Sequence, residues 1–501
     1  MRHYQKILGC TAALALSVSL VGCAAEGVPV LTVAAATVET AAVSDGVTIR
    51  FTNTGVTASE AGNLEIDGTS VSITGAGTYL LSGSCGSGCV KVKKGVTGVT
   101  LVLNGLDLTA QDTAPIVCAK STEVTIEAAA GTENRLSDTE GNNTESGNTD
   151  AENAVIKCKD GSRVTLCGTG SLTVEAKGKN GIKSGASTQE EGEASLTIRD
   201  LTLTVDAPVN DAVNAESTLN VESGTLTISA GDDAIHSDAT LNVGSENTQG
   251  PAITITGCCE GLEGATVNVY SGNVSILSTD DCINAANPDL TNYDYSLNIS
   301  GGTVTACSTT GDGFDSNGSI TISGGTVTVW TANAADNSPL DADGAVTISG
   351  GTVLAAGDSS GMGLDLSVRQ PCVIFTGSGE DTRDQGSRFG FGGSSFLSEG
   401  SAFAVTDSQG NSLCSGEAKC NTSFLLFSSD ALTADETYTL SGGSSQQTAQ
   451  AQSGTVKSGM GGMGGMGGGP GDSGQKPENF DPSRKPDKRS LDPGSKPEGQ
   501  P

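Results

Sequence analysis

Gly231-Asp232-Asp233-Ala234-Ile235-His236 is one copy of a short phrase that returns along the middle of this chain of 501 residues. Each copy joins acidic or amide residues to one apolar residue and then to another polar residue. The apolar centres lie roughly 21 to 31 residues apart, a spacing that is typical of solenoid repeats. These centres are Val155, Ile182, Val213, Ile235, Leu262, Ile283, Phe314, Leu340 and Leu364.

Short alternating segments separate the phrases. In Ser319-Ile320-Thr321-Ile322 and Gly325-Thr326-Val327-Thr328-Val329, β-branched residues alternate with others, which indicates strands with one buried face. Outside the extreme N-terminus no segment shows sustained helical periodicity. With about three strands in each repeat, the sequence predicts an all-β fold, namely a right-handed parallel β-helix with a small C-terminal β cap.

Stacked repeats lie about 4.8 Å apart, so equivalent positions form columns. One column lies two residues before each apolar centre and another lies just after it. Both point outward on the same edge, because each flanks an inward residue. Carboxylates about 5 Å apart repel by roughly 3 kcal/mol at an effective dielectric constant near 20. Such columns therefore require raised pKa values or bound cations.

Calcium suits this arrangement, because its flexible geometry accepts clustered carboxylate, amide and backbone oxygens. The predicted calcium ligands are Asp211, Asn214, Asp232, Asp233, Glu260, Glu263, Asp280, Asp281, Asn284, Asp312, Asp315, Asp341 and Asp343. The alternative is that these residues only form turns and face water. Zinc is disfavoured, because His3 and His236 are the two histidines of the chain.

The charge of the chain restricts its partners. The formal net charge is −32, and aromatic residues make up 3% of the sequence. Such an acidic surface argues against nucleic acid and against an anionic membrane surface as partners. It also disfavours an acidic polymer, unless calcium bridges the protein and the polymer. We expect a monomer.

The N-terminus predicts export. A basic region, Met1 to Lys6, precedes an apolar stretch from Ile7 to Val21 that is too short to span a membrane as a mature helix. The stretch ends in Leu20-Val21-Gly22-Cys23, which resembles a bacterial lipobox. This resemblance implies a lipid on Cys23 and attachment to the extracellular face of the bacterial cell membrane. The alternative is ordinary secretory cleavage.

Composition divides the chain into five parts. From Pro371 the repeat stops and longer strand patterns begin, which we interpret as a cap over the last repeat. The predicted parts are a signal peptide (1–22), a tether with the first strands (23–64), the β-helix (65–368), the β cap (369–440) and a disordered tail rich in Gly/Met and Pro/Lys (441–501).

Twelve cysteines remain when Cys10 and Cys23 are set aside. An even number in an exported chain permits disulfides, but the sequence does not give their connectivity. Three close pairs could staple turns: Cys85 with Cys89, Cys158 with Cys167, and Cys414 with Cys420. The alternative is that cysteines such as Cys118, Cys282 and Cys307 are free thiols stacked inside the repeats.

Several motifs resemble those of the clostridial carbohydrate-binding β-helix family. They are Ile73-Thr74-x-x-Gly77-Thr78-Tyr79-x-x-Ser82-Gly83, Leu103-Asn104-Gly105, Gly131-Thr132-Glu133-Asn134 with Leu136-Ser137-Asp138, and the Ser-Gly-Gly-Thr-Val strands. The similarity covers roughly residues 65 to 440. It implies a calcium-bound, right-handed parallel β-helix that binds plant cell-wall polysaccharides, notably polygalacturonate and cellulose, without established catalysis. This chain departs from the acidic pattern at Lys183, His236, Ser338 and Met362.

We therefore expect a surface-anchored, calcium-dependent carbohydrate-binding protein rather than an enzyme. One alternative is a polysaccharide lyase or galacturonase on the same fold. A lyase would need a cation and an Arg or Lys base, and a hydrolase would need a spaced pair of carboxylates. Lys183, one repeat from Asp211, and Arg199 are the first candidates for that base. Another alternative is a structural or adhesive surface protein. Trp330 could stack on sugar or pack against the repeats.

Overall fold

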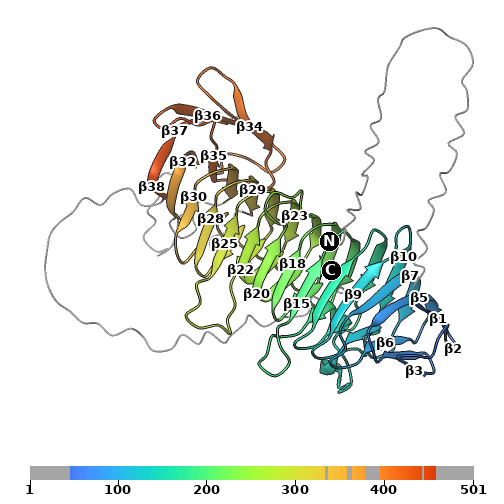
Figure 1. Ribbon diagram of the computed structural model, residues 1–501. Helices are drawn as coiled ribbons and strands as arrows, with labels where there is room; N and C mark the ends of the chain where they lie inside the picture. Colours follow the sequence, from blue (N-terminus) through green and yellow to red (C-terminus); the bar gives the residue numbers. More distant parts are fainter. Residues whose placement is uncertain (1–45, 333–336, 358–363, 378–394, 443–444, 459–501) are drawn as a thin grey trace, which may run out of the picture.

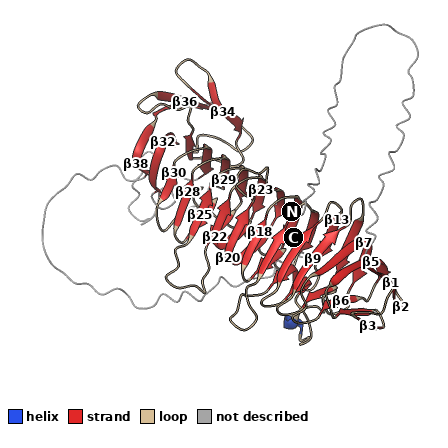
Figure 2. Cartoon of the chain, in the orientation of Figure 1, coloured by secondary structure: helices blue, strands red, loops and turns tan. Residues whose placement is uncertain are grey.

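The computed structural model describes residues 46–332, 337–357, 364–377, 395–442 and 445–458. Over these ranges the chain consists of strands and their connections, with one short 3₁₀ turn, η1 (Thr144–Ser146). An elongated 34-stranded sheet makes up most of the molecule, and a small 4-stranded sheet lies at its C-terminal end (Figures 1 and 2). The predicted all-β class is confirmed.

The large sheet contains three stacks of parallel strands, in each of which a strand pairs with strands one repeat earlier and later. Stack A carries the apolar centres. It comprises β4 (Ser70–Ile73), β6 (Cys89–Val92), β8 (Ile116–Cys118), β11 (Ala154–Cys158), β14 (Asn180–Ser184), β17 (Val213–Ala215), the starts of β20 (Ile235–Val243) and β22 (Leu262–Val269), β24 (Ile283–Ala285) and β27 (Phe314–Ser316).

Stacks B and C complete each repeat. Stack B comprises β1 (Val47–Thr52), β5 (Gly77–Cys85), β7 (Val99–Thr109), β9 (Glu123–Ala128), β12 (Arg163–Cys167), β15 (Ser195–Ile198), β18 (Thr218–Val221), the ends of β20 and β22, β25 (Ser296–Ile299), β28 (Ser319–Ile322), β30 (Val346–Ile348) and β32 (Leu364–Thr376). Stack C comprises the ends of β5 and β7, β10 (Glu133–Ser137), β13 (Ser171–Glu175), β16 (Thr202–Ala207), β19 (Thr225–Ala230), β21 (Ala252–Gly257), β23 (Asn273–Ser278), β26 (Thr303–Ser308), β29 (Thr326–Thr331) and β31 (Thr352–Gly357).

The core lies between the stacks, where one residue in two along each strand is buried. In β18 and β28 the buried residues alternate with partly exposed polar ones, as the sequence pattern predicts. The apolar centres from Ile182 to Leu340 pair with one another in register and are almost fully buried. This shared interior fixes the register, because a shift by one residue would turn the apolar side chains outward.

Two predicted centres are wrong. Ile156, and not Val155, pairs with Ile182, so the predicted centre at Val155 lies one residue too early in the chain. Leu364 pairs with Ser458 in an antiparallel arrangement, while its neighbour Leu366 continues stack B beside Val346.

Antiparallel strands cover both ends of the large sheet. At the N-terminal end β1 pairs with β2 (Gly55–Ala58), and β3 (Leu64–Asp67) pairs with β4. At the other end β35 (Phe424–Ser428) pairs with β31 and β32, and β38 (Gln452–Ser458) pairs with β32. The 4-stranded sheet, in the order β34 (Ser412–Glu417), β33 (Ala402–Thr406), β36 (Thr437–Gly442) and β37 (Ser445–Gln450), lies beyond them (Figure 1).

Strands β37 and β38 fall within the tail for which disorder is predicted from residue 441. That prediction is wrong for Ser445–Ser458, because these residues pair with β36 and β32. Trp330 is 2% exposed and packs edge-on against Phe403 of the cap, with ring centroids 5.7 Å apart. Its role is therefore packing, and stacking on sugar is excluded by its burial.

The described cysteines are free thiols. Cys118 and Cys158 are neighbours in stack A, in β8 and β11, and both are buried. None of the described segments forms a helix with the length and hydropathy that a membrane crossing requires. The predicted signal peptide (1–22), the lipid site Cys23 and the tail beyond Ser458 lie outside the described residues.

Candidate functional site

Two columns of polar residues run along stack A. The outer column holds the residue after each apolar centre, and parallel register places its members side by side. Its members are Lys157, Lys183, Asn214, His236, Glu263, Asn284, Asp315 and Asp341. The turn column holds the residue two positions before each centre from Ile182 on: Asn180, Asp211, Asp233, Glu260, Asp281, Asp312 and Ser338.

The turn column is held in place by hydrogen bonds between repeats. Oδ1 of Asp281 accepts from the backbone N–H of Asp312 over 2.7 Å, and Oδ1 of Asp211 accepts from the N–H of Asp233 over 3.3 Å. Oδ1 of Asp312 accepts from the N–H of Ser338. In these three residues one carboxylate oxygen fixes the next turn, which leaves the other oxygen for the outer column.

In Asp211 and Glu260 a carboxylate oxygen also accepts from an amide group of the outer column. Nδ2 of Asn214 donates to Oδ2 of Asp211 over 2.6 Å, and Nδ2 of Asn284 donates to Oε2 of Glu260 over 3.0 Å. These contacts join the two columns into one polar surface. The contact between Asp211 and Asn214 is local, because the two residues flank one inward residue, whereas Asn284 reaches Glu260 on the preceding repeat.

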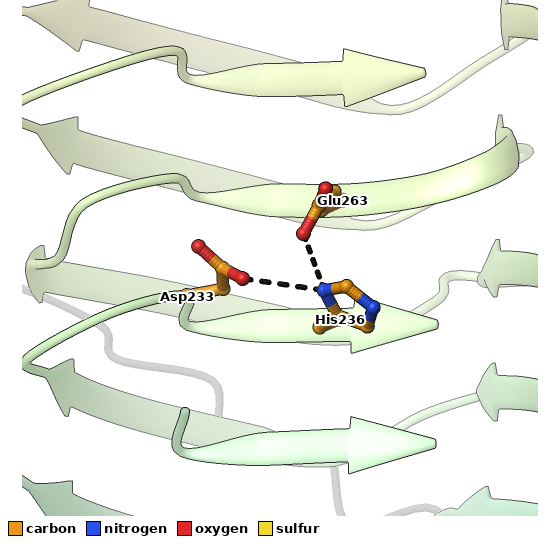
Figure 3. Close-up of side chains that lie close together, drawn as sticks. All are labelled: Asp233, His236 and Glu263. Carbon is orange, nitrogen blue, oxygen red and sulfur yellow. Dashed lines mark hydrogen bonds and ion pairs between the residues drawn. The ribbon is translucent and has the colours of Figure 1, made fainter. Parts of the chain in front are cut away.

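His236 supplies a positive charge inside this surface. Its Nδ1 lies 3.2 Å from Oδ2 of Asp233 and in contact with Oε2 of Glu263 (Figure 3). Its Nε2 lies 2.8 Å from Oδ1 of Asp238. Burial alone lowers the pKa of His236, but the three carboxylates outweigh burial and raise it to about 12. The imidazolium therefore acts as a built-in cation between two acidic repeats.

Asp312, Asp315 and Asp341 form a second cluster, in which one carboxylate oxygen of each residue lies within 4.8 Å of the others. Burial raises the pKa of Asp312 to about 7 and that of Asp315 to about 6, and the charge of Asp341 adds to both shifts. Unlike the cluster around His236, this group has no imidazole or ammonium group within ion-pair distance in the described part of the chain. It is therefore the stronger candidate for a bound cation.

The pKa values of two further carboxylates, Glu260 and Asp281, are also strongly raised. Burial raises the pKa of Glu260 to about 9, and the neighbouring Glu263 and Asp233 charges raise it further. Burial also raises the pKa of Asp281 to about 8, with Asp315 adding to the shift. These carboxylates hold protons near neutral pH unless a cation compensates their charge.

Two amide oxygens in the columns are orphaned. Oδ1 of Asn214 and Oδ1 of Asn284 are buried and accept no hydrogen bond from the described residues. A buried carbonyl oxygen without a donor costs roughly 1–3 kcal/mol, and here each one lies among carboxylates. Carboxylate and amide oxygens together match the ligand set of a hard divalent cation. The residues present therefore fit a metal ion of this class.

Some predicted ligands lie at the margin of the site. Asp232 and Asp280 precede the turn column by one residue, and Asp343 follows Asp341 by two. None of the three belongs to the close carboxylate groupings found among the described residues. Their part in a metal site stays a prediction, as does that of the other acidic positions.

The sequence analysis does not identify two features of the columns. Asp238 completes the shell of His236, but it lies two residues beyond the repeated phrase. Lys157 belongs to the outer column beside Lys183. With Val155 as the apolar centre, the sequence instead places Ile156 in this column. The similar segments Val155-Ile156-Lys157 and Gly181-Ile182-Lys183 are the signal that could have found it.

Three comparisons place the chain among known proteins. A curated relative from Acetivibrio thermocellus, described as a carbohydrate-binding domain-containing protein, is 33% identical over 175 residues, which span 34% of this chain and 57% of the relative. A solved polysaccharide lyase-like protein from C. thermocellum, a gadolinium derivative, is 25% identical, with a TM-score of 0.39, over 55% of this chain and 96% of that chain. The family model described as carbohydrate-binding domain-containing protein matches residues 67–361, more than half of the chain. The chain belongs to this family of carbohydrate-binding domain-containing proteins.

Proposed function

We propose that this protein binds an acidic polysaccharide, such as polygalacturonate, through calcium ions held by the outer and turn columns of stack A. Family membership supports carbohydrate binding in general. The observation that carries the calcium proposal is the pair of orphaned oxygens on Asn214 and Asn284 within columns of carboxylates. Cellulose is a second possible glycan, for which calcium would not need to bridge.

Three groups of residues would hold the ions. Asp312, Asp315 and Asp341 form the first group, in which one carboxylate oxygen of each residue lies within 4.8 Å of the others. Asn284 with Glu260 forms a second group, which Glu263 and Asp281 flank on neighbouring repeats, and Asn214 with Asp211 forms a third. When bound, calcium supplies positive charge and open coordination positions for glycan carboxylates. The side chains of this protein fix where the ions sit, because the backbone N–H bonds to Asp211, Asp281 and Asp312 hold their carboxylates in place.

The fold suits a long, regular ligand. We infer that the three stacks wind as a right-handed parallel β-helix, since crossover connections between parallel strands are right-handed in about 98% of cases. Each repeat then presents its outer-column residue about 4.8 Å from the next. A linear polysaccharide with one carboxylate per sugar could follow such a column over several repeats.

Anchoring at the cell surface is part of the same proposal. The Leu20-Val21-Gly22-Cys23 motif supports lipid attachment at Cys23, at the extracellular face of a bacterial cell membrane. Mass spectrometry of the membrane fraction would detect the lipidated Cys23, and Cys23→Ser should release the protein. An unmodified N-terminus at Ala24 or beyond would exclude the anchor.

The function is tested by retention on immobilised polygalacturonate. The full chain should be retained in calcium and released by chelator, because a chain of net charge −32 repels a polyanion unless cations mediate the contact. Moderate salt should weaken retention by screening. Retention that ignores chelator would contradict the calcium mechanism and favour hydrogen bonding to a neutral glycan.

A polysaccharide lyase is the second candidate. The observation in its favour is that Lys157 and Lys183 lie on the same column as the acidic clusters, where one of them could act as a base beside a bound cation. Prolonged incubation with polygalacturonate and calcium decides between the two functions. A binding protein forms no unsaturated product, whereas steady absorbance from a new double bond would assign a lyase.

A further inference from the structure

The charge of the outer column changes from positive to negative along its length. From β11 to β27 it runs through Lys157, Lys183, Asn214, His236 and Glu263 to Asp315. The two lysines are Cα partners on adjacent parallel strands, so their side chains leave the sheet about 4.8 Å apart on the same face. A basic pair therefore adjoins the acidic part of the column, with Asn214 between them.

The two carboxylates whose charges act on Lys157, Glu216 and Glu152, each pair with another lysine. Lys183 forms an ion pair with Glu216 at 3.1 Å, and Lys159 forms one with Glu152 at 2.8 Å. Lys157 has no carboxylate within ion-pair distance among the residues that the structure describes. In a chain of net charge −32, one ammonium group on the column is left without an anionic partner.

Lys157 also lies in a setting that favours an anionic ligand. It is partly buried, and burial together with the charge of Lys183 lowers its pKa. A lysine in this setting gains from an anion, since a bound carboxylate offsets both the lost hydration and the repulsion between neighbouring ammonium groups.

We infer that Lys157 and Lys183 form a direct carboxylate-binding subsite, in which a uronate group of the polysaccharide contacts the two ammonium groups without a calcium bridge. The inference rests on the proposed function and specifies it further. One polyuronate chain lying along the outer column would meet ammonium groups at one end and calcium ligands at the other. This polarity would fix where the glycan ends on the protein.

The test uses calorimetric titration of an oligogalacturonide into the full-length protein at saturating calcium. Lys157→Gln and Lys183→Gln should each weaken binding about tenfold, the effect of losing one charge-assisted contact. Lys157→Arg should recover most of the affinity, because it keeps the charge. Lys419→Gln, which removes a lysine that lies 3.9 Å from Glu417 in the cap, is the matched control and should bind like wild type.

Calcium stoichiometry and the unfolding temperature in calcium should be unchanged in all four variants, which separates a subsite from a folding defect. If wild type binds the oligogalacturonide and both Gln variants bind equally well, the subsite is overturned while the proposed function stands. If wild type does not bind in calcium, both are overturned. Loss of affinity in Lys157→Arg as large as in Lys157→Gln would also contradict an anion contact.

Discussion

The backbone N–H of Asp312 donates to Oδ1 of Asp281 over 2.7 Å, so a side chain of one repeat fixes the turn of the next. The same relation joins Asp211 to the N–H of Asp233. The acidic residues are therefore part of the architecture as well as candidate ligands. A change at Asp281 would disturb both roles. The carboxylate of Asp315 accepts no such bond from the described residues of the next repeat, so a change there allows the two roles to be separated.

Asp315→Asn should have opposite effects in chelator and in calcium. In chelator above neutral pH the variant should be more stable by about 1–2 kcal/mol, because one of several mutually repelling carboxylates is removed. In calcium it should be less stable than wild type and should bind at least one ion fewer. Chemical denaturation with metal analysis checks this, with the exposed Asp289→Asn as the control of equal charge change. The same sign of effect in both conditions would contradict a metal site at Asp315.

His236→Asn should convert the built-in cation into a further metal position. Without the imidazolium, Asp233 and Glu263 face each other unneutralised, so stability in chelator should fall by about 2 kcal/mol. Asparagine already occupies the equivalent position at Asn214 and Asn284, so calcium should restore stability and the bound ions should increase by one. Metal analysis of the variant decides. An unchanged ion count with lost stability would show that the acidic pair cannot hold calcium.

Stability in chelator should fall as the pH rises from about 4 to about 9. Glu260, with a pKa of about 9, and Asp281, with a pKa of about 8, hold their protons in the folded state to far higher pH than in the unfolded chain. Carboxyl groups with pKa values raised by folding stabilise the fold below the unfolded pKa, and this contribution is lost as pH rises through the folded pKa. The unfolding temperature in chelator, measured across this pH range, tests whether stability falls as the pH rises.

Saturating calcium should flatten the same profile, because the ligands are then ionised and compensated at neutral pH. Calcium binding near pH 7 should also release protons, and titrations in buffers of different ionisation enthalpy would detect them. A profile that rises with pH in chelator would contradict the raised pKa values.

Asn268→Ala should reduce stability without affecting the glycan. On stack B, Nδ2 of Asn268 donates to Oδ1 of Asn242 over 2.9 Å, and Oδ1 of Asn268 accepts from Asn298 over 3.0 Å. Removing Asn268 takes the donor from Oδ1 of Asn242 and one of two acceptors from Nδ2 of Asn298, which also donates to Ser296, at a cost of about 1–2 kcal/mol. Denaturation and retention on polygalacturonate check the prediction together. Loss of retention at full stability would place the ligand on stack B instead of stack A.

The repeat could be predicted from the sequence because its signal is local. Alternation within Ser319-Ile320-Thr321-Ile322 and the regular spacing of Val213, Ile235 and Leu262 both follow from a buried face shared by successive repeats. The columns follow from the same register, so the neighbours of Asn214 and Asp315 could be named in advance. Their role as metal ligands stays a prediction.

Other features depend on contacts that spacing does not encode. Val155 and Ile156 are both apolar and both buried, so only pairing with Ile182 distinguishes them. The low-complexity composition around residues 445–458 hides strands that form because β32 and β36 offer unpaired edges. The positive charge of the outer column at His236 depends on Asp233, Asp238 and Glu263 together, and Asp238 lies outside the repeated phrase.

The central claim is that calcium on stack A mediates binding of an acidic polysaccharide. The most direct measurement is the affinity of the full-length protein for an oligogalacturonide, titrated calorimetrically first in calcium and then in excess chelator, with a methyl-esterified oligomer as the neutral comparison. The account predicts binding of the acidic oligomer in calcium, at least a tenfold loss in chelator, and weak binding of the esterified oligomer throughout. Equal affinity for the acidic oligomer with and without chelator would contradict it.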